Sequence, residues 1–316
     1  MFYRKVILPL ISRLSPQNAS TLVYKTLGIL NRFFLTRWLL RLVYFRSFTS
    51  LKKEVFGITF PNPIGLGAGI DRNAEFCDII TGVGFGFVEI GPVTPVADHG
   101  RYTENRGVIE AIKNLKSIHS KTIIAANIAC NNNTPEEYMG PQLEKSVALL
   151  YDFADMFVIN AAVSDGAKRS PLEDPDTLAE VMDGVLDMRM TMSGMKPVLI
   201  RLLPDIPKDQ LDLILDYSMR SGVDGIVAGD VNTRHGGSKF DKNIEFIRYI
   251  RNHTGGRLEI IGCGGIMKPE EAHEMLQAGA SLIELYTGIF LEGPRLVRKT
   301  LKLLEDRLES EKTQKS

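Results

Sequence analysis

The sequence predicts a (β/α)₈ barrel preceded by a basic amphipathic helical segment. Two observations predict the barrel: short apolar runs alternate with longer helical stretches from Pro61 onward, and eight such runs can be counted. Parallel strands that are buried on both faces produce continuous apolar runs of this kind. The length of 316 residues and the hydrophobic content of 44% suffice for one large core. We therefore divide the chain into a helical segment (1–53), a barrel (54–304) and a polar tail (305–316) that is expected to fray.

The eight predicted strands follow one another in regular order. They span Pro63–Gly67, Phe87–Gly91, Thr122–Ile128, Met156–Ala161, Pro197–Leu202, Gly225–Ala228, Leu258–Gly262 and Leu282–Tyr286. Together with their helices they occupy about 230 residues, close to the ~250 that are typical of a closed barrel. An open doubly wound sheet would more often have fewer strands.

The N-terminal segment differs sharply in charge from the rest of the chain. Residues 1–53 contain no Asp or Glu, whereas the net charge of the whole chain is zero. The ten basic residues of this segment are Arg4, Lys5, Arg13, Lys25, Arg32, Arg37, Arg41, Arg46, Lys52 and Lys53. The segment therefore carries +10 and the remainder −10, which indicates an anionic partner for the segment.

The same segment has apolar residues at helical spacing, with a break between two helices expected at Ser15–Pro16. Its arginines interrupt each apolar run before the ~20 residues that a bilayer crossing needs. We expect the segment to lie on an anionic membrane surface, with the protein peripheral on the cytoplasmic side. The alternative is a helical cap that packs on the barrel with its basic side in water.

The last two predicted strands end in glycine-rich turns that could hold a phosphate. Gly264 and Gly265 follow strand seven, and Tyr286 and Thr287 end strand eight. Glycines let backbone N–H groups approach an anion, and the loops after these two strands frequently bind phosphate in barrels of this class. The three cysteines lack metal-ligand spacing, so no metal is expected, and neither is a nucleic-acid partner.

Other strand ends supply groups that suit a flat heterocycle. Ala68 and Gly69 follow strand one, where small residues leave room for a ring against the backbone. Asn127, Asn160 and Arg201 end three consecutive strands. An isoalloxazine edge alternates acceptors and donors that match Asn amides, and a cation near it would stabilise its reduced anion.

The sequence resembles the membrane-associated, quinone-linked dihydroorotate dehydrogenases. The resemblance rests on the segments FPNPIGLGAGIDRNAE, GFGFVEIGPVTP, GCGGI and AGASLIELYTGIFLEGP. It implies an FMN enzyme of pyrimidine biosynthesis that oxidises dihydroorotate to orotate, with residues 1–45 forming a tunnel for a membrane quinone. It also implies FMN contacts at Ala68, Gly69, Asn127, Asn160, Gly264, Gly265, Tyr286 and Thr287, with Arg201 in place of the family's lysine.

The substrate side departs from the family pattern. The family's proton-abstracting serine is replaced by Val163, which cannot take a proton, so Asp165 or Ser164 becomes the candidate base. Arg72 stands where the family has its substrate lysine, and the family loop after strand two is shortened. The predicted substrate-binding residues are Arg72, Asn160, Asn232 and Thr233. These changes leave two alternatives open: a flavin oxidoreductase with another substrate, or a non-catalytic FMN-binding relative at the membrane.

Overall fold

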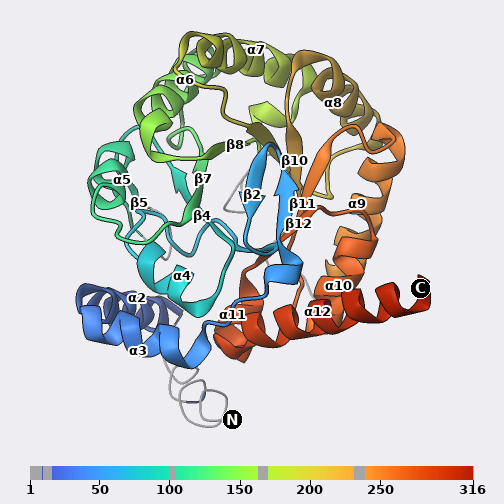
Figure 1. Cartoon of the computed structure of the whole chain (residues 1–316). Coiled ribbons are helices and arrows are strands. Elements are labelled where there is room, and N and C mark those ends of the chain that lie inside the picture. Colours follow the sequence, from blue (N-terminus) through green and yellow to red (C-terminus); the bar gives the residue numbers. More distant parts are fainter. Residues whose placement is uncertain (1–8, 10–15, 100–103, 163–169, 231–238, 316) are drawn as a thin grey trace.

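Eight parallel strands close into a barrel, as predicted (Figure 1). The computed structural model describes residues 9, 16–99, 104–162, 170–230 and 239–315. Around the barrel the strands follow chain order, and β12 pairs with β3 to close it. The barrel strands are β3 (Ile64–Leu66), β4 (Phe87–Val93), β7 (Ile123–Ile128), β8 (Met156–Asn160), β9 (Val198–Leu202), β10 (Gly225–Ala228), β11 (Glu259–Cys263) and β12 (Leu282–Leu285).

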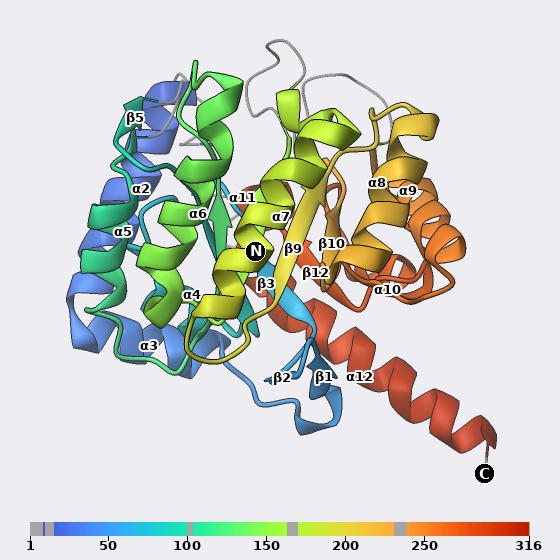
Figure 2. The same cartoon turned by 90° about the horizontal axis from the view of Figure 1, so that it is seen from above.

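Helices surround the barrel and cover the outer faces of the strands (Figures 1 and 2). Their inner sides join the strands in one continuous apolar core. They are α4 (Cys77–Val83), α5 (Val108–Leu115), α6 (Met139–Leu150), α7 (Pro175–Thr191), α8 (Lys208–Ser221), α9 (Lys239–Thr254), α10 (Pro269–Gln277), α11 (Thr287–Glu292) and α12 (Arg295–Lys315).

A hairpin closes the end of the barrel at which the strands begin. Its strands are β1 (Lys53–Val55) and β2 (Ile58–Phe60), and Figure 1 shows it across the barrel axis. Phe60 meets Phe87, at the start of β4, edge to face with ring centroids 5.5 Å apart. Apolar side chains fill this end of the barrel. Polar ligands are therefore expected at the opposite end, where the strands finish.

Two N-terminal helices, α2 (Pro16–Arg32) and α3 (Phe34–Tyr44), pack beside α4 (Figure 1). Helix α2 begins at Pro16, where proline is well tolerated. Residues 10–15 lie outside the described residues, so the break expected before this helix stays a prediction. A break that was not predicted separates α2 from α3 at Phe33, which has extended backbone angles. Of the predicted helix before Pro16, only Pro9 is described, and it is helical.

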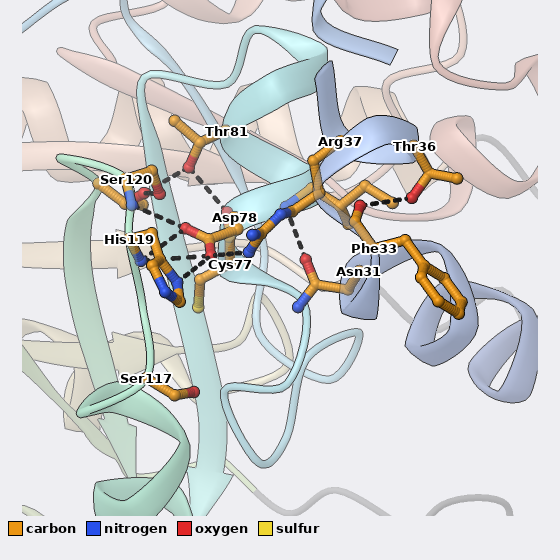
Figure 3. A network of polar contacts seen from close by, with 12 residues as sticks. Asn31, Phe33, Thr36, Arg37, Cys77, Asp78, Thr81, Ser117, His119 and Ser120 are labelled. Atoms are coloured by element: carbon orange, nitrogen blue, oxygen red, sulfur yellow. Dashed lines mark hydrogen bonds and ion pairs between the residues drawn. The ribbon is translucent and has the colours of Figure 1, made fainter. Parts of the chain in front are cut away.

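A polar network fastens these helices to α4 (Figure 3). Arg37 forms an ion pair with Asp78 at 2.7 Å, and Asn31 donates to the Glu75 carbonyl at 2.7 Å. Asp78 also accepts the backbone N–H groups of His119 and Ser120. Burial alone would raise the pKa of Asp78, but the hydrogen bonds from Ser120 and His119 and the charge of Arg37 lower it. The network therefore holds α3 against the barrel through an ionised carboxylate.

The polar tail differs from the expected frayed end. Helix α12 runs unbroken to Lys315 and projects beyond the barrel (Figure 2). Its last turns are mostly exposed, although Leu308 still packs partly on the core. Residues 305–315 are rich in Glu, Lys, Arg and Leu, which favour helix without tertiary packing. This intrinsic preference keeps the tail helical despite its low apolar content.

Candidate active site

The two predicted glycine-rich turns lie against each other at the mouth of the barrel. Gly264 and Gly265 adopt φ values of +87° and +80°, which favour glycine. A Cβ on Gly264 would collide with the carbonyl oxygen of Asp230, and one on Gly288 with that of Ile266. The turn after β11 therefore touches both the loop after β10 and the start of α11, where Thr287 is the first residue. This brings together the backbone groups that we predicted would hold a phosphate.

The turn after β3 forms the adjoining wall. Gly69 has φ +101°, and a Cβ there would lie 3.1 Å from the ring of Tyr286. Its N–H donates to the Gly91 carbonyl at 2.7 Å, and its carbonyl accepts the Tyr24 hydroxyl at 3.2 Å. Ala68 beside it is buried. The predicted ring-facing residues Ala68, Gly69 and Tyr286 are therefore together, and Tyr24 of α2 joins them.

The side chains of Asn127, Asn160 and Arg201 lie at neighbouring strand ends. Asn160 and Arg201 are register partners on β8 and β9, and Asn127 is on β7, which pairs with β8. All three are buried. Asn127 donates to the Glu89 carboxylate at 2.6 Å, and Asn160 accepts the N–H of Ala162 at 3.1 Å. The structure thus brings together the three polar groups that we expected to share one ligand.

Arg201 lies between two buried carboxylates that the sequence analysis did not single out. Its Nη1 is 3.9 Å from Oε1 of Glu89 on β4 and 3.9 Å from Oε2 of Glu284 on β12. Its Nη2 is 3.4 Å from the Cys263 sulfur. Burial alone would lower the pKa of Arg201, but Cys263, Glu89 and Glu284 raise it overall. Burial, followed by the charge of Glu89, raises the pKa of Glu284 well above its ordinary value.

Several polar atoms at this mouth have no hydrogen-bond partner within the described residues. They include Asn127 Oδ1, Arg201 Nη1 and Arg72 Nε, all of which are inaccessible to solvent. Buried polar atoms in folded proteins nearly always have a partner, so unpaired ones at the end of a barrel point to a ligand or water. One acceptor and two cationic donors match the polar edge of the isoalloxazine ring of FMN. The closely packed glycine turns suit the phosphate group of FMN. The residues present therefore suit FMN.

Arg72 lies in the same region, after β3. Burial raises the pKa of both Tyr24 and Tyr286, and the positive charge of Arg72 opposes this rise at both hydroxyls. Arg72 is thus a cation near the barrel mouth, as its predicted role requires. Asn160, also predicted to bind the substrate, is buried at the end of β8. The remaining predicted substrate and base residues lie outside the described residues, as does Val163: Ser164, Asp165, Asn232 and Thr233.

Three residues of the candidate site were not predicted from the sequence: Glu89, Glu284 and Tyr24. Glu89 and Glu284 sit within apolar strands, in FVEIGPV and LIEL, and a lone carboxylate in such a run is a readable signal of a buried charge. Tyr24 gave no signal, because its contact with Gly69 spans 45 positions of the chain.

A cavity of about 550 Å³ lies beside α2, between this helix and the start of α4. Tyr24, Gly28 and Asn31 line one side, and Ala74 and Phe76 line the other. Charged side chains also contribute to its wall: Lys25, Arg32, Arg37, Glu75, Asp78 and Arg106. Since Tyr24 also touches Gly69, the cavity and the barrel mouth share a wall.

Comparison with known proteins agrees with this architecture. The dihydroorotate dehydrogenase family model matches residues 50–243 and 236–308. Dihydroorotate dehydrogenase (quinone) of Idiomarina loihiensis is 30% identical, with 95% of this chain and 99% of that protein covered. The protein of the same name from Christiangramia forsetii is 31% identical over 81% of this chain and 85% of its own length.

Solved structures of similar fold carry the same family name. The DHODH of Eimeria tenella in complex with ferulenol superposes with a TM-score of 0.77 at 21% identity, covering 88% of this chain and 91% of that one. At this identity the likeness concerns the fold. The family model and the relatives of about 30% identity go further and confirm the resemblance seen in the motifs. This chain therefore belongs to the dihydroorotate dehydrogenase family.

Proposed function

We propose that this protein is an FMN-dependent, quinone-linked dihydroorotate dehydrogenase that works at a membrane surface. The observation that carries the proposal is a pair of buried atoms that accept or donate no hydrogen bond within the described residues, Asn127 Oδ1 and Arg201 Nη1, beside the paired glycine turns. Bound FMN would accept a hydride from the substrate and deliver the electrons to a quinone. The product would be orotate, an intermediate of pyrimidine biosynthesis.

In this proposal, backbone groups bind one part of the FMN and side chains bind another. Gly264, Gly265 and Thr287 would hold the phosphate, and Ala68 and Gly69 would face the ring. Asn127 and Asn160 would bind the ring's polar edge, with Arg201 supplying positive charge there. Arg201 is 3.9 Å from both Glu89 and Glu284, and burial raises the pKa of Glu284, so the charge that reaches the ring depends on the protonation of Glu284.

The substrate would lie over the flavin with its carboxylate near Arg72. A buried carboxylate needs a cation, and the Arg72 guanidinium suits two parallel hydrogen bonds to it. Asn160, Asn232 and Thr233 would bind the remaining polar groups. Asp165 is the better proton acceptor and Ser164 the second candidate. The negative charge of Asp165 makes a compensating cation near the substrate necessary.

The membrane part of the proposal rests on α3. Its outward side carries a continuous apolar stripe at helical spacing, with Phe34 73% and Trp38 49% exposed. The other members of this α3 stripe are Leu35, Leu39, Leu42 and Val43. The segment thus packs on the barrel, as the cap alternative predicted, but it turns an apolar side outward rather than only a basic one.

Exposed apolar patches of this kind mark interaction surfaces, and an interfacial helix would place the stripe at the acyl boundary. Within the described residues no helix combines the length and hydropathy needed to cross a bilayer. The cavity between α2 and α4 would then admit the quinone toward the flavin.

The proposal is tested by mixing the purified flavoprotein with dihydroorotate in the absence of oxygen. Rapid bleaching of the flavin absorbance, followed by reoxidation with a quinone, is expected. Bleaching only with another donor would favour the first alternative. Reduction by dithionite, but by no organic donor, would favour a non-catalytic relative. With activity in hand, Asp165→Asn should slow flavin reduction more than Ser164→Ala, and equal rates for both variants and the wild type would overturn the base assignment.

A further inference from the structure

A second groove lies outside the barrel, between the end of α3 and the first turns of α12. Its volume is about 610 Å³. Val43 and Tyr44 form one side, and residues from Arg295 to Arg307 form the other. Figure 1 shows α3 and α12 along the same edge of the molecule, well away from the centre of the barrel. Nothing in the proposed reaction uses this groove.

The α12 side of this groove is strongly basic. It presents five cations, Arg295, Arg298, Lys299, Lys302 and Arg307, against one carboxylate, Asp306. All of these side chains are exposed. Within the described residues none of the five cations forms an ion pair, although Glu305 and Asp306 lie only three and four positions beyond Lys302 on the same helix. Positions 295, 299 and 302 follow the spacing of one helix face, so the charges point the same way.

The groove adjoins the apolar stripe of α3. Val43 belongs to that stripe, is 52% exposed, and is also part of the groove wall. An apolar stripe that ends at a cluster of cations can bind both chemical parts of an anionic lipid. The stripe would contact the acyl chains, and the cations would contact the phosphate. A soluble anion would match the cations but would leave the apolar stripe exposed to water.

We propose that this groove binds the phosphate headgroup of an anionic phospholipid within a bilayer, with Lys299 and Lys302 as principal contacts. The inference rests on the proposed membrane association and extends it beyond residues 1–53 to the C-terminal helix. The stripe would then enter the acyl boundary while α12 meets the headgroups. Two contacts on different elements fix the rotation of the barrel on the membrane, which one amphipathic helix alone does not.

The test measures binding of the full-length holoprotein to lipid vesicles. Wild type, Lys299→Gln/Lys302→Gln and a matched control, Lys145→Gln/Lys242→Gln, are sedimented with phosphatidylcholine vesicles with and without phosphatidylglycerol. Lys145 and Lys242 are exposed residues of α6 and α9. Each cation at an anionic surface contributes ~1 kcal/mol. The groove variant should therefore lose about thirty-fold in affinity for the anionic vesicles. Its binding to phosphatidylcholine alone, and the affinity of the control, should stay unchanged.

Each other outcome overturns a defined part of the proposal. Equal losses in the groove variant and the control would mean that only total charge matters, and wild-type affinity in the groove variant would exclude the site. Release of the wild type by inorganic phosphate, at constant ionic strength, would assign the groove to a free anion. Absence of wild-type binding to either vesicle would refute the membrane proposal itself. Flavin reduction by dihydroorotate is followed in parallel, so that failure of the enzymatic proposal is seen separately.

Discussion

The two sides of the barrel mouth differ in the groups that shape them: backbone on one side and side chains on the other. On the side of β11, β12 and β3, the backbone does most of the shaping: Gly264, Gly265 and Gly69 adopt positive φ and have close neighbours. On the side of β7 and β9, side chains do it, in the cluster of Asn127, Arg201 and Glu89. A backbone site accepts few residue changes, whereas a side-chain site can keep its charge with a different cation, although Arg and Lys differ in size and donor geometry. This matches the resemblance, which is strong in the glycine turns and weaker around Arg201.

On the backbone side, a large loss of FMN affinity is expected from Gly264→Ala. The new Cβ would meet the Asp230 carbonyl in a left-handed conformation, at a combined cost of roughly 2–4 kcal/mol. FMN affinity should fall more than tenfold, as measured by titration of the apoprotein.

Gly194→Ala is the matched control for this change. Gly194 has φ +79° but no atom within 4 Å of the added Cβ. It carries the conformational cost alone and should leave FMN binding intact. Equal FMN affinities in the two variants would show that the close approach at Gly264 does not shape the phosphate site.

On the side-chain side, Arg201→Met should destabilise the protein by about 3–5 kcal/mol, because it leaves the buried Glu89 carboxylate without a cation. Arg201→Lys keeps the charge and should cost clearly less. The free energy of unfolding in urea measures both. If Met proved as well tolerated as Lys, the cluster would be held by something other than the charge of Arg201.

The contrast also explains what could be predicted from the sequence. The eight strands were evident because strands buried on both faces leave apolar runs, and the glycine turns because few residues suit those backbone angles. The Arg201 cluster was only partly evident: Arg201 ends a strand, but its partners lie on β4 and β12, which only barrel closure brings near. The contact of Tyr24 with Gly69 and the helical tail depend on packing and local propensity, which apolar periodicity does not record.

A smaller effect is expected from Asp71, a buried carboxylate that accepts backbone hydrogen bonds in the turn after β3. It accepts the N–H groups of Glu75 and Phe76, and its carbonyl accepts that of Gly91. Burial raises the pKa of Asp71 to about 6, while those backbone hydrogen bonds oppose the rise. The folded state therefore binds the proton more tightly than the unfolded state.

Stability from this group is fully present below the unfolded pKa of about 4 and is lost as the pH rises through 6, at a cost of roughly 2–3 kcal/mol. Asp71→Asn cannot ionise, so its unfolding free energy should lack this fall, relative to the wild type, between pH 4 and 6. Parallel pH profiles for the two proteins would rule out Asp71 as the source.

The smallest effect is expected from Glu284→Gln, and it tests how the side-chain cluster holds its charge. Neither oxygen of Glu284 has a hydrogen-bond partner within the described residues, and its raised pKa favours the protonated, neutral form. Glutamine resembles that form in shape and charge, so the free energy of unfolding should change by no more than about 1 kcal/mol.

Glu89→Gln is the matched comparison, since Glu89 accepts the 2.6 Å hydrogen bond from Asn127 and would lose an acceptor that faces Arg201. Glu89→Gln should lower the free energy of unfolding more than Glu284→Gln does. The reverse order would mean that Glu284 of β12, rather than Glu89 of β4, chiefly balances the charge of Arg201.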